Sequence, residues 1–160
     1  MAVSRAAKQS KVAPAKTVPT SGSVTGFLDG VSDPQRRADC DTLVTMMTRA
    51  TGEEARMWGS SIVGFGEVYC QGSGGRVSHA PRLGFSPRKT ALSLYLIDGV
   101  QHHDADLAKL GPHDLGKGCL YLSSLGDVDL KALASILGAS VKNSKRMFSD
   151  QPPSTDLGER

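Results

Sequence analysis

Aromatic residues and cysteines are scarce in this chain of 160 residues. Only 5% of the residues are aromatic, so each aromatic position carries information about a core or a binding surface. The three cysteines, Cys40, Cys70 and Cys119, form no CxxC pair, which predicts reduced thiols in a reducing compartment. The sequence also lacks an uncharged apolar run long enough to span a membrane, and its N-terminus has no apolar core typical of a signal peptide. These absences predict a cytoplasmic protein without a membrane segment.

Acidic residues are missing from positions 1–23. Four basic residues there, Arg5, Lys8, Lys11 and Lys16, leave a net charge of −1 for the other residues out of the formal total of +3. A nearly neutral body argues against a dedicated nucleic-acid-binding face. The segment is polar and has no apolar periodicity, so we predict a disordered basic tail.

Residues 24–148 are expected to form one domain, because this length can bury a core of ordinary size. The segment 149–160, SDQPPSTDLGER, has the polar character of the N-terminal segment and predicts a flexible C-terminal tail. The hydrophobic share of 39% is typical of a globular protein.

Two long helices are predicted from capping residues and apolar spacing. Asp33 offers an N-cap before Pro34, and Gly52 ends an apolar pattern, which predicts a helix over about Pro34–Thr51. Asp127 can cap a second helix, predicted over about Asp129–Lys142, and a short helix is expected near Asp104–Leu110. The apolar positions of the two long helices are Cys40, Leu43, Val44, Met47 and Ala50, and Leu130, Leu133, Ala134, Leu137 and Val141.

Four strands are predicted between and after these helices. They are Glu67–Gln71, Arg82–Ser86, Ala91–Ile97 and Cys119–Ser123. The glycine-rich segment 57–66 contains too many glycines for a helix and is expected to lead into the first strand. The short connection at positions 87–90 indicates a hairpin. This order of elements predicts an α+β fold in which an antiparallel β-sheet has flanking helices packed on one face.

Alternation along the strands predicts which side chains point away from the core. Leu92, Leu94 and Leu96 share one side of the sheet, whereas Tyr95 lies on the other. The same parity turns Tyr69, Cys119 and Tyr121 outward. The three tyrosines thus predict a partly wet binding surface, although tyrosine is also common on the exposed face of a purely structural sheet.

Positive charges flank this tyrosine-bearing face in the predicted turns. Arg88 and Lys89 lie in the hairpin connection, and Lys117 lies in a Gly-Lys-Gly turn whose backbone can approach a ligand closely. The spacing is not that of a phosphate-binding P-loop. The alternatives are a site for a small anionic ligand and an ordinary solvated turn.

Three separated blocks resemble the YdhG-like domain of unknown function. They are MWGSSIVGFGEVY, LGFSPRKTALSLYL and LGKGCLYLSSLGDVDL, and the resemblance extends over about residues 24–141. It implies an α+β fold in a superfamily that includes frataxin-like iron chaperones and YjbR-like proteins. The positions characteristic of the family fall on Trp58, Gly59, Gly64, Gly66, Phe85, Arg88, Lys89, Tyr95, Gly116, Lys117, Cys119 and Tyr121.

The function expected from these features is that of a non-enzymatic binding domain without a cofactor. Its expected ligand is a small anion or a protein partner, with homodimerisation through the same face as a further possibility. The expected ligand-binding residues are Trp58, Tyr69, Arg88, Lys89, Tyr95, Lys117, Cys119 and Tyr121.

Two other functions are weighed against binding. The resemblance implies a frataxin-like iron chaperone, for which the available ligands are His102, His103, Asp104 and Asp106, with His113 and Asp114 further on. A cysteine-dependent enzyme would use Cys119 as nucleophile and His113 or His103 as base.

Overall fold

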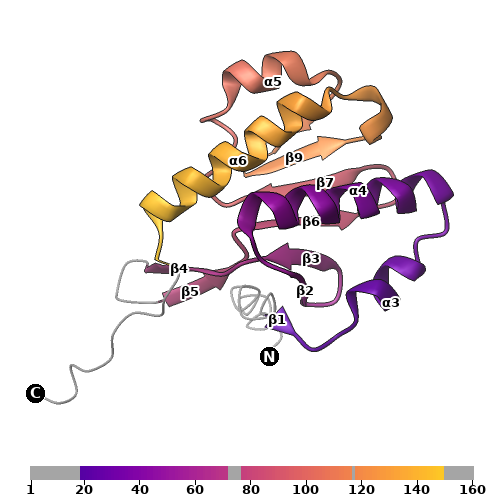
Figure 1. Cartoon of the computed structure of the whole chain (residues 1–160), viewed down its shortest axis with the longest axis horizontal. Coiled ribbons are helices and arrows are strands. Elements are labelled where there is room, and N and C mark those ends of the chain that lie inside the picture. Colours follow the sequence, from indigo (N-terminus) through magenta and orange to yellow (C-terminus); the bar gives the residue numbers. More distant parts are fainter. Residues whose placement is uncertain (1–18, 72–76, 117, 150–160) are drawn as a thin grey trace, which may run out of the picture.

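The computed structural model describes residues 19–71, 77–116 and 118–149 (Figure 1). A sheet of seven strands runs in the order β1-β2-β3-β6-β7-β9-β8, and every neighbouring pair is antiparallel. Its strands are β1 (Pro19–Thr20), β2 (Ala55–Trp58), β3 (Ile62–Phe65), β6 (Leu83–Pro87), β7 (Leu92–Leu96), β8 (Asp114–Leu115) and β9 (Cys119–Leu122). A second sheet pairs β4 (Val68–Gln71) with β5 (Val77–Ala80).

Two long helices cross the same face of the larger sheet (Figure 1). They are α4 (Pro34–Thr51) and α6 (Leu130–Met147), and the shorter helices are α3 (Val24–Asp29) and α5 (Asp104–Leu110). The Asp33 carboxylate accepts a hydrogen bond from the backbone nitrogen of Arg36 at 3.1 Å, which caps α4. Gly52 ends the helix with a φ of 75°. The predicted α+β fold and the bounds predicted for α4 and α5 are confirmed. None of the helices in these ranges is long and apolar enough to cross a membrane.

The core lies between the helices and the predicted leucine side of the sheet. Leu94 and Leu122 are fully buried, so the predicted strand parity is confirmed for β7 and β9. The residues that fill this layer from both sides are Cys40, Leu43, Met47, Leu83, Phe85, Leu92, Leu94, Leu96, Leu120, Leu122, Leu133, Ile136 and Leu137. Burial of this apolar surface is the main force that holds α4 and α6 on the sheet.

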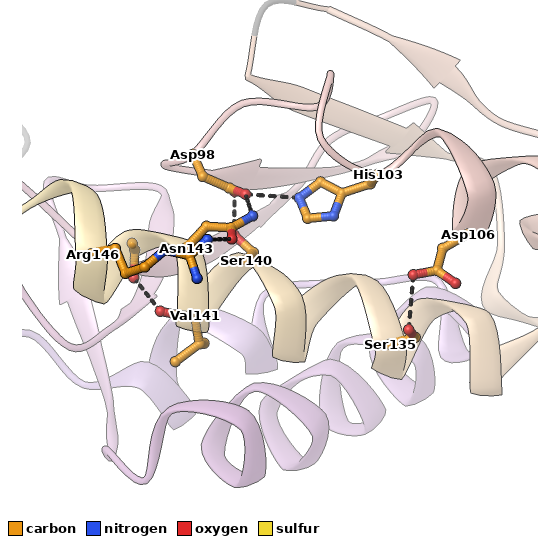
Figure 2. A network of polar contacts seen from close by, with 9 residues as sticks. Asp98, His103, Asp106, Ser135, Ser140, Val141, Asn143 and Arg146 are labelled. Atoms are coloured by element: carbon orange, nitrogen blue, oxygen red, sulfur yellow. Dashed lines mark hydrogen bonds and ion pairs between the residues drawn. The ribbon is translucent and has the colours of Figure 1, made fainter.

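A buried polar network also joins α6 to the sheet (Figure 2). Asp98 follows β7 and accepts hydrogen bonds from Ser140 at 2.5 Å and from Asn143 at 2.9 Å. His103, which precedes α5, places Nε2 2.9 Å from the same carboxylate. Burial opposes ionisation of Asp98, but the hydrogen bonds from His103, Ser140 and Asn143 outweigh it and lower its pKa. The carboxylate therefore ties β7, α5 and α6 together.

The glycine-rich segment 57–66 forms two strands, which the sequence analysis did not predict. Gly59 has a φ of 69° and supplies the turn between β2 and β3. Gly64 lies inside β3 beneath the indole of Trp58, where an added Cβ would come within 2.4 Å of Cδ1. The glycines therefore serve a turn and a close approach of backbone and ring, rather than a loop.

The strand predicted at Glu67–Gln71 does not belong to the larger sheet. β4 pairs with β5 in the second sheet, with Tyr69 opposite His79. Residues that form β5 were not predicted as a strand. The prediction was wrong because hydrophobic alternation identifies a strand but not its partner.

The second long helix differs from its prediction at its start, its end and its buried side. Asp129, and not Asp127, is the N-cap of α6, with its carboxylate 2.9 Å from the Lys131 nitrogen. The helix continues to Met147, beyond the predicted end at Lys142. Leu133, Leu137 and Val141 are buried as predicted. Leu130 and Ala134 are exposed instead, and Ile136 and Ser140 are buried.

The ends of the domain extend beyond the predicted limits. Pro19 and Thr20 pair with β2, and the Ser23 hydroxyl caps α3, so residues 19–23 are part of the fold. The Tyr69 nitrogen donates to the carbonyl of Ser149 at 2.8 Å. The remainder of the two predicted tails, 1–18 and 150–160, lies outside the described residues.

Candidate anion-binding groove

The turn between β6 and β7 carries two of the cations expected to bind a ligand. The Arg88 nitrogen donates to the Ala91 carbonyl at 2.8 Å, which closes the turn after Pro87. The Arg88 and Lys89 side chains are exposed at this turn. With Pro87, they form one wall of a groove of about 460 Å³.

The opposite wall of the groove comes from the first helices. It consists of Phe27 from α3, residues 30–33 of the following loop, and Arg36 from the first turn of α4. Phe27, Val31 and Pro87 add apolar surface to a lining that also contains three cations. The volume lies in the range of about 300–1,000 Å³ found for small-molecule sites.

Arg36 is the groove cation with incomplete hydrogen bonding. Its Nη1 is buried and has no hydrogen-bond partner among the described residues. The neighbouring Arg37 is bound to Asp29 at 2.7 Å and to Asp41 at 3.2 Å. A buried donor without a partner costs about 1–3 kcal/mol, so an acceptor placed at Arg36 would recover stability.

A carboxylate also lines the groove. Asp33 already accepts the hydrogen bond from the Arg36 backbone nitrogen that caps α4. The lining contains Arg36, Arg88 and Lys89 against Asp33, which leaves it with a net charge of +2. This balance favours an anion with more than one charge.

On the sheet face opposite the helices, Arg88 meets the predicted tyrosine surface. Arg88 Nη2 donates to the Tyr95 hydroxyl at 3.2 Å, and Tyr95 stands opposite Cys119 in the β7–β9 pair. The interaction with Cys119 is the main cause of the raised pKa of the Tyr121 phenol. The structure therefore brings four of the predicted site residues together: Arg88, Tyr95, Cys119 and Tyr121.

Two of the aromatic residues predicted to bind the ligand, Tyr69 and Trp58, lie away from this cluster. Tyr69 belongs to the second sheet, where its ring stacks on His79 with centroids 4.6 Å apart. Trp58 is 1% exposed and packs edge-on against the same imidazole at 5.0 Å. The prediction that three tyrosines share one sheet face is wrong, because β4 is not a strand of that sheet. Trp58 is buried and offers no exposed surface to a ligand.

Lys117 is the third cation predicted for the site. It lies outside the described residues. Its neighbour Gly118 has a φ of 78°, in agreement with the turn expected from the Gly-Lys-Gly sequence.

The imidazoles considered as bases for Cys119 have other partners. His103 is 3% exposed and lies against Asp98. His113 Nδ1 lies 2.7 Å from the Gly111 carbonyl. These contacts give no support to a cysteine–histidine pair.

The side chains of residues 102–106 that were considered as iron ligands do not converge on one point. His103 points to Asp98, and Asp106 accepts a hydrogen bond from Ser135 at 2.8 Å (Figure 2). His102 is exposed. In the part of the chain that the structure covers, no group of three or more His, Cys, Asp or Glu side chains is arranged to hold a metal ion.

Arg36 was not among the residues predicted for the site. Arg37 has an aspartate four positions later, whereas Arg36 has Cys40 there. That pattern predicts that Arg37 is paired, whereas for Arg36, which has aspartates three positions away on either side, it predicts no single outcome. The proximity of Arg36 to the hairpin cations, more than 50 positions later, could not be read from the pattern.

A second groove of about 540 Å³ lies between α4 and α6. Its lining is apolar or neutral apart from Arg49: Thr42, Thr45, Met46, Arg49, Ala50, Leu130, Ala134 and Gly138. The groove between α3, α4 and the hairpin is therefore the more strongly cationic of the two.

Comparisons with protein-family models, curated proteins and solved structures found no significant match to the chain. The resemblance to YdhG-like domains stays a prediction from the sequence blocks.

Proposed function

We propose that this domain is a non-enzymatic binding module that holds a small anionic ligand between Arg36 on one wall of the groove and Arg88 and Lys89 on the other. The observation that supports this most is the buried and unpartnered Nη1 of Arg36 in a groove shared with two exposed cations. Native proteins rarely leave a buried donor unpaired, and such groups occur at binding sites.

The three cations complement each other chemically. A guanidinium presents several N–H donors in a planar fork and binds carboxylate or phosphate oxygens with charge-assisted hydrogen bonds. Lys89 adds a flexible point charge at the open side. An anion in the groove would contact groups from α4 and from the hairpin at once.

Tyr95 supports the proposed site without lining it. Its hydroxyl accepts a hydrogen bond from Arg88 Nη2, and an anion in the groove would bind other N–H groups of the same guanidinium. The proposed ligand therefore lies on the helix side of the hairpin, whereas the strand pattern of the sequence predicts it on the tyrosine-bearing face.

We infer a cytoplasmic location from cysteine usage. Cys40 and Cys119 are free thiols, and burial raises the pKa of the Cys40 thiol to about 11, so this side chain acts as part of the core. A frataxin-like role in iron delivery has the support of the YdhG-like resemblance alone.

A titration of the isotopically labelled protein with inorganic phosphate tests the proposed function. Amide signals of residues 30–36 and 88–91 should shift in a saturable manner. Arg36→Gln and Lys89→Gln should each weaken binding by about fivefold, as expected for loss of one partly exposed charge.

Matched controls remove cations away from the groove. Arg49→Gln, at the other end of α4, and Lys142→Gln, on α6, should leave the phosphate affinity unchanged. If phosphate causes no saturable shifts, or if both groove variants bind it like the native protein, the proposed site is wrong.

A further inference from the structure

We infer that the ligand of the groove is an organic phosphomonoester, with a dianionic phosphate joined to a compact apolar body. This inference rests on the proposed anion site and specifies the class of molecule that it selects. It follows from the charge balance, the two-walled arrangement of the cations and the apolar part of the lining.

The charge balance of the groove matches a dianion. Three basic residues, Arg36, Arg88 and Lys89, line the groove together with a single carboxylate residue, Asp33. Arg37 adds little, because Asp29 and Asp41 both pair with it. A carboxylate ligand would neutralise only half of the net charge of +2, whereas a phosphomonoester carries about −1.5 to −2 at pH 7.

The arrangement of donors also fits a phosphate group. Arg36 lies on the helical wall, and Arg88 and Lys89 lie on the hairpin wall. A phosphomonoester has three strong acceptor oxygens, so one group can meet more than one of these cations. The Nη1 of Arg36 is covered in this structure, so the side chain would have to turn toward the groove for this nitrogen to obtain the partner that it lacks among the residues described.

The remaining part of the groove has room for more than a free phosphate ion. Its volume of about 460 Å³ is many times the roughly 30 Å³ of a water molecule in the liquid. Phe27 and Val31 are partly buried against the core, and with Pro87 they present apolar surface to the groove. An apolar body of the size of an aromatic ring would cover this surface.

The lining of the groove contains no histidine and no cysteine. The charged groups that line it or bind its cations are Asp33, Arg36, Arg88, Lys89 and Tyr95, with Asp29, Arg37 and Asp41 beside them. The change in affinity between pH 7.5 and 5 should therefore report the second ionisation of the ligand, which has a pKa of about 6.

Calorimetric titrations of the full chain with three probes test this inference. Phenyl phosphate, phenyl sulfate and inorganic phosphate differ in charge and in the presence of a ring. At pH 7.5 phenyl phosphate should bind at least about fivefold more tightly than the monoanionic phenyl sulfate. It should bind about tenfold more tightly than inorganic phosphate, because the ring buries apolar surface. At pH 5 its advantage over phenyl sulfate should disappear.

Two variants test separately whether the cations of the groove bind the phosphate and whether its apolar residues bind the ring. Arg36→Gln should reduce the preference for phenyl phosphate over phenyl sulfate, and Val31→Ser should reduce its preference over inorganic phosphate. Arg49→Gln should change neither ratio.

The outcomes separate this inference from the proposed function. Equal binding of phenyl phosphate and phenyl sulfate at pH 7.5 would overturn the dianion while the anion site stands. Equal binding of phenyl phosphate and inorganic phosphate would overturn the apolar body. If no probe binds, the proposed function itself is wrong.

Discussion

Arg36 and Arg37 are adjacent in sequence, but their guanidinium groups differ in their hydrogen-bond partners. Arg37 is held by two carboxylates, and its pKa is raised chiefly by the hydrogen bond to Asp29. Arg36 keeps a buried nitrogen without a partner in the described structure. The helical repeat explains this difference, since successive residues point about 100° apart around the axis. Only Arg36 reaches the groove.

Tyr95 is expected to act as a positioning residue for Arg88. Tyr95→Phe removes the acceptor of the 3.2 Å hydrogen bond and lets the guanidinium move more freely. Phosphate affinity should fall about threefold, because the ordering of Arg88 must then accompany binding. Thermal unfolding should be unchanged, since the Tyr95 hydroxyl is not part of the core.

The matched control for this change is Tyr69→Phe. It removes a hydroxyl from the second sheet, and the phosphate affinity should stay at the native value. Native or tighter binding by Tyr95→Phe would show that the hydrogen bond does not position Arg88 for the anion.

At the scale of elements, Asp98 connects three segments of the fold. Its hydrogen bonds add directional contacts to the non-directional packing of apolar side chains. Its carboxylate contacts the side chains of His103, Ser140 and Asn143 (Figure 2). A buried carboxylate is tolerated when hydrogen bonds satisfy it, and each lost partner then becomes costly. The network therefore sets the position of α6 relative to β7.

Asp98→Asn should destabilise the domain by about 1–3 kcal/mol at pH 7, because the amide cannot accept all three contacts. The pKa of Asp98 is lower in the folded chain than its ordinary value. Its ionised form therefore adds stability above the unfolded-state pKa, about 3.9, and this contribution is lost as the pH falls through the folded-state pKa. The difference between native protein and variant, measured by urea unfolding, should shrink below pH 4.

Asp106→Asn is the control for this prediction. Asp106 also contacts α6, through Ser135, but this hydrogen bond is exposed. Its loss should cost less than about 0.5 kcal/mol. An Asp98→Asn protein as stable as the native one at pH 7 would contradict the proposed role of the network.

For the whole molecule, the limits of the folded domain are testable. The described fold begins with β1 and ends at Ser149. A chain without residues 2–18 and 150–160 should unfold at the native temperature, as the composition of these segments predicts. Removing residues 19–23 as well deletes the β1 pairing and the Ser23 cap of α3. This should lower the midpoint of thermal unfolding by about 3–6 °C.

The two truncated chains are compared with each other and with the full chain by their midpoints of thermal unfolding. A large loss of stability on removal of 2–18 would show that the predicted tail contributes to the fold. Equal midpoints for the two truncated chains would show that neither β1 nor the Ser23 cap contributes measurably.

The sequence alone determined the features that depend on neighbouring residues. Asp33, Pro34 and Gly52 specify the ends of α4 through capping and backbone conformation, and the structure has the predicted bounds. Alternation of Leu92, Leu94 and Leu96 specified the buried side of β7 in the same way. Such signals act within a few residues and do not require knowledge of the fold.

Only the tertiary structure decided which distant segments meet. It paired β4 with β5, which removed Tyr69 from the face of Tyr95 and Tyr121. It also placed Arg36 of α4 in one groove with Arg88 and Lys89 of the hairpin. Hydrophobic periodicity is equally compatible with several strand partners and helix positions. The choice among them comes from packing of the whole core, and the chemistry of the proposed site follows from that choice.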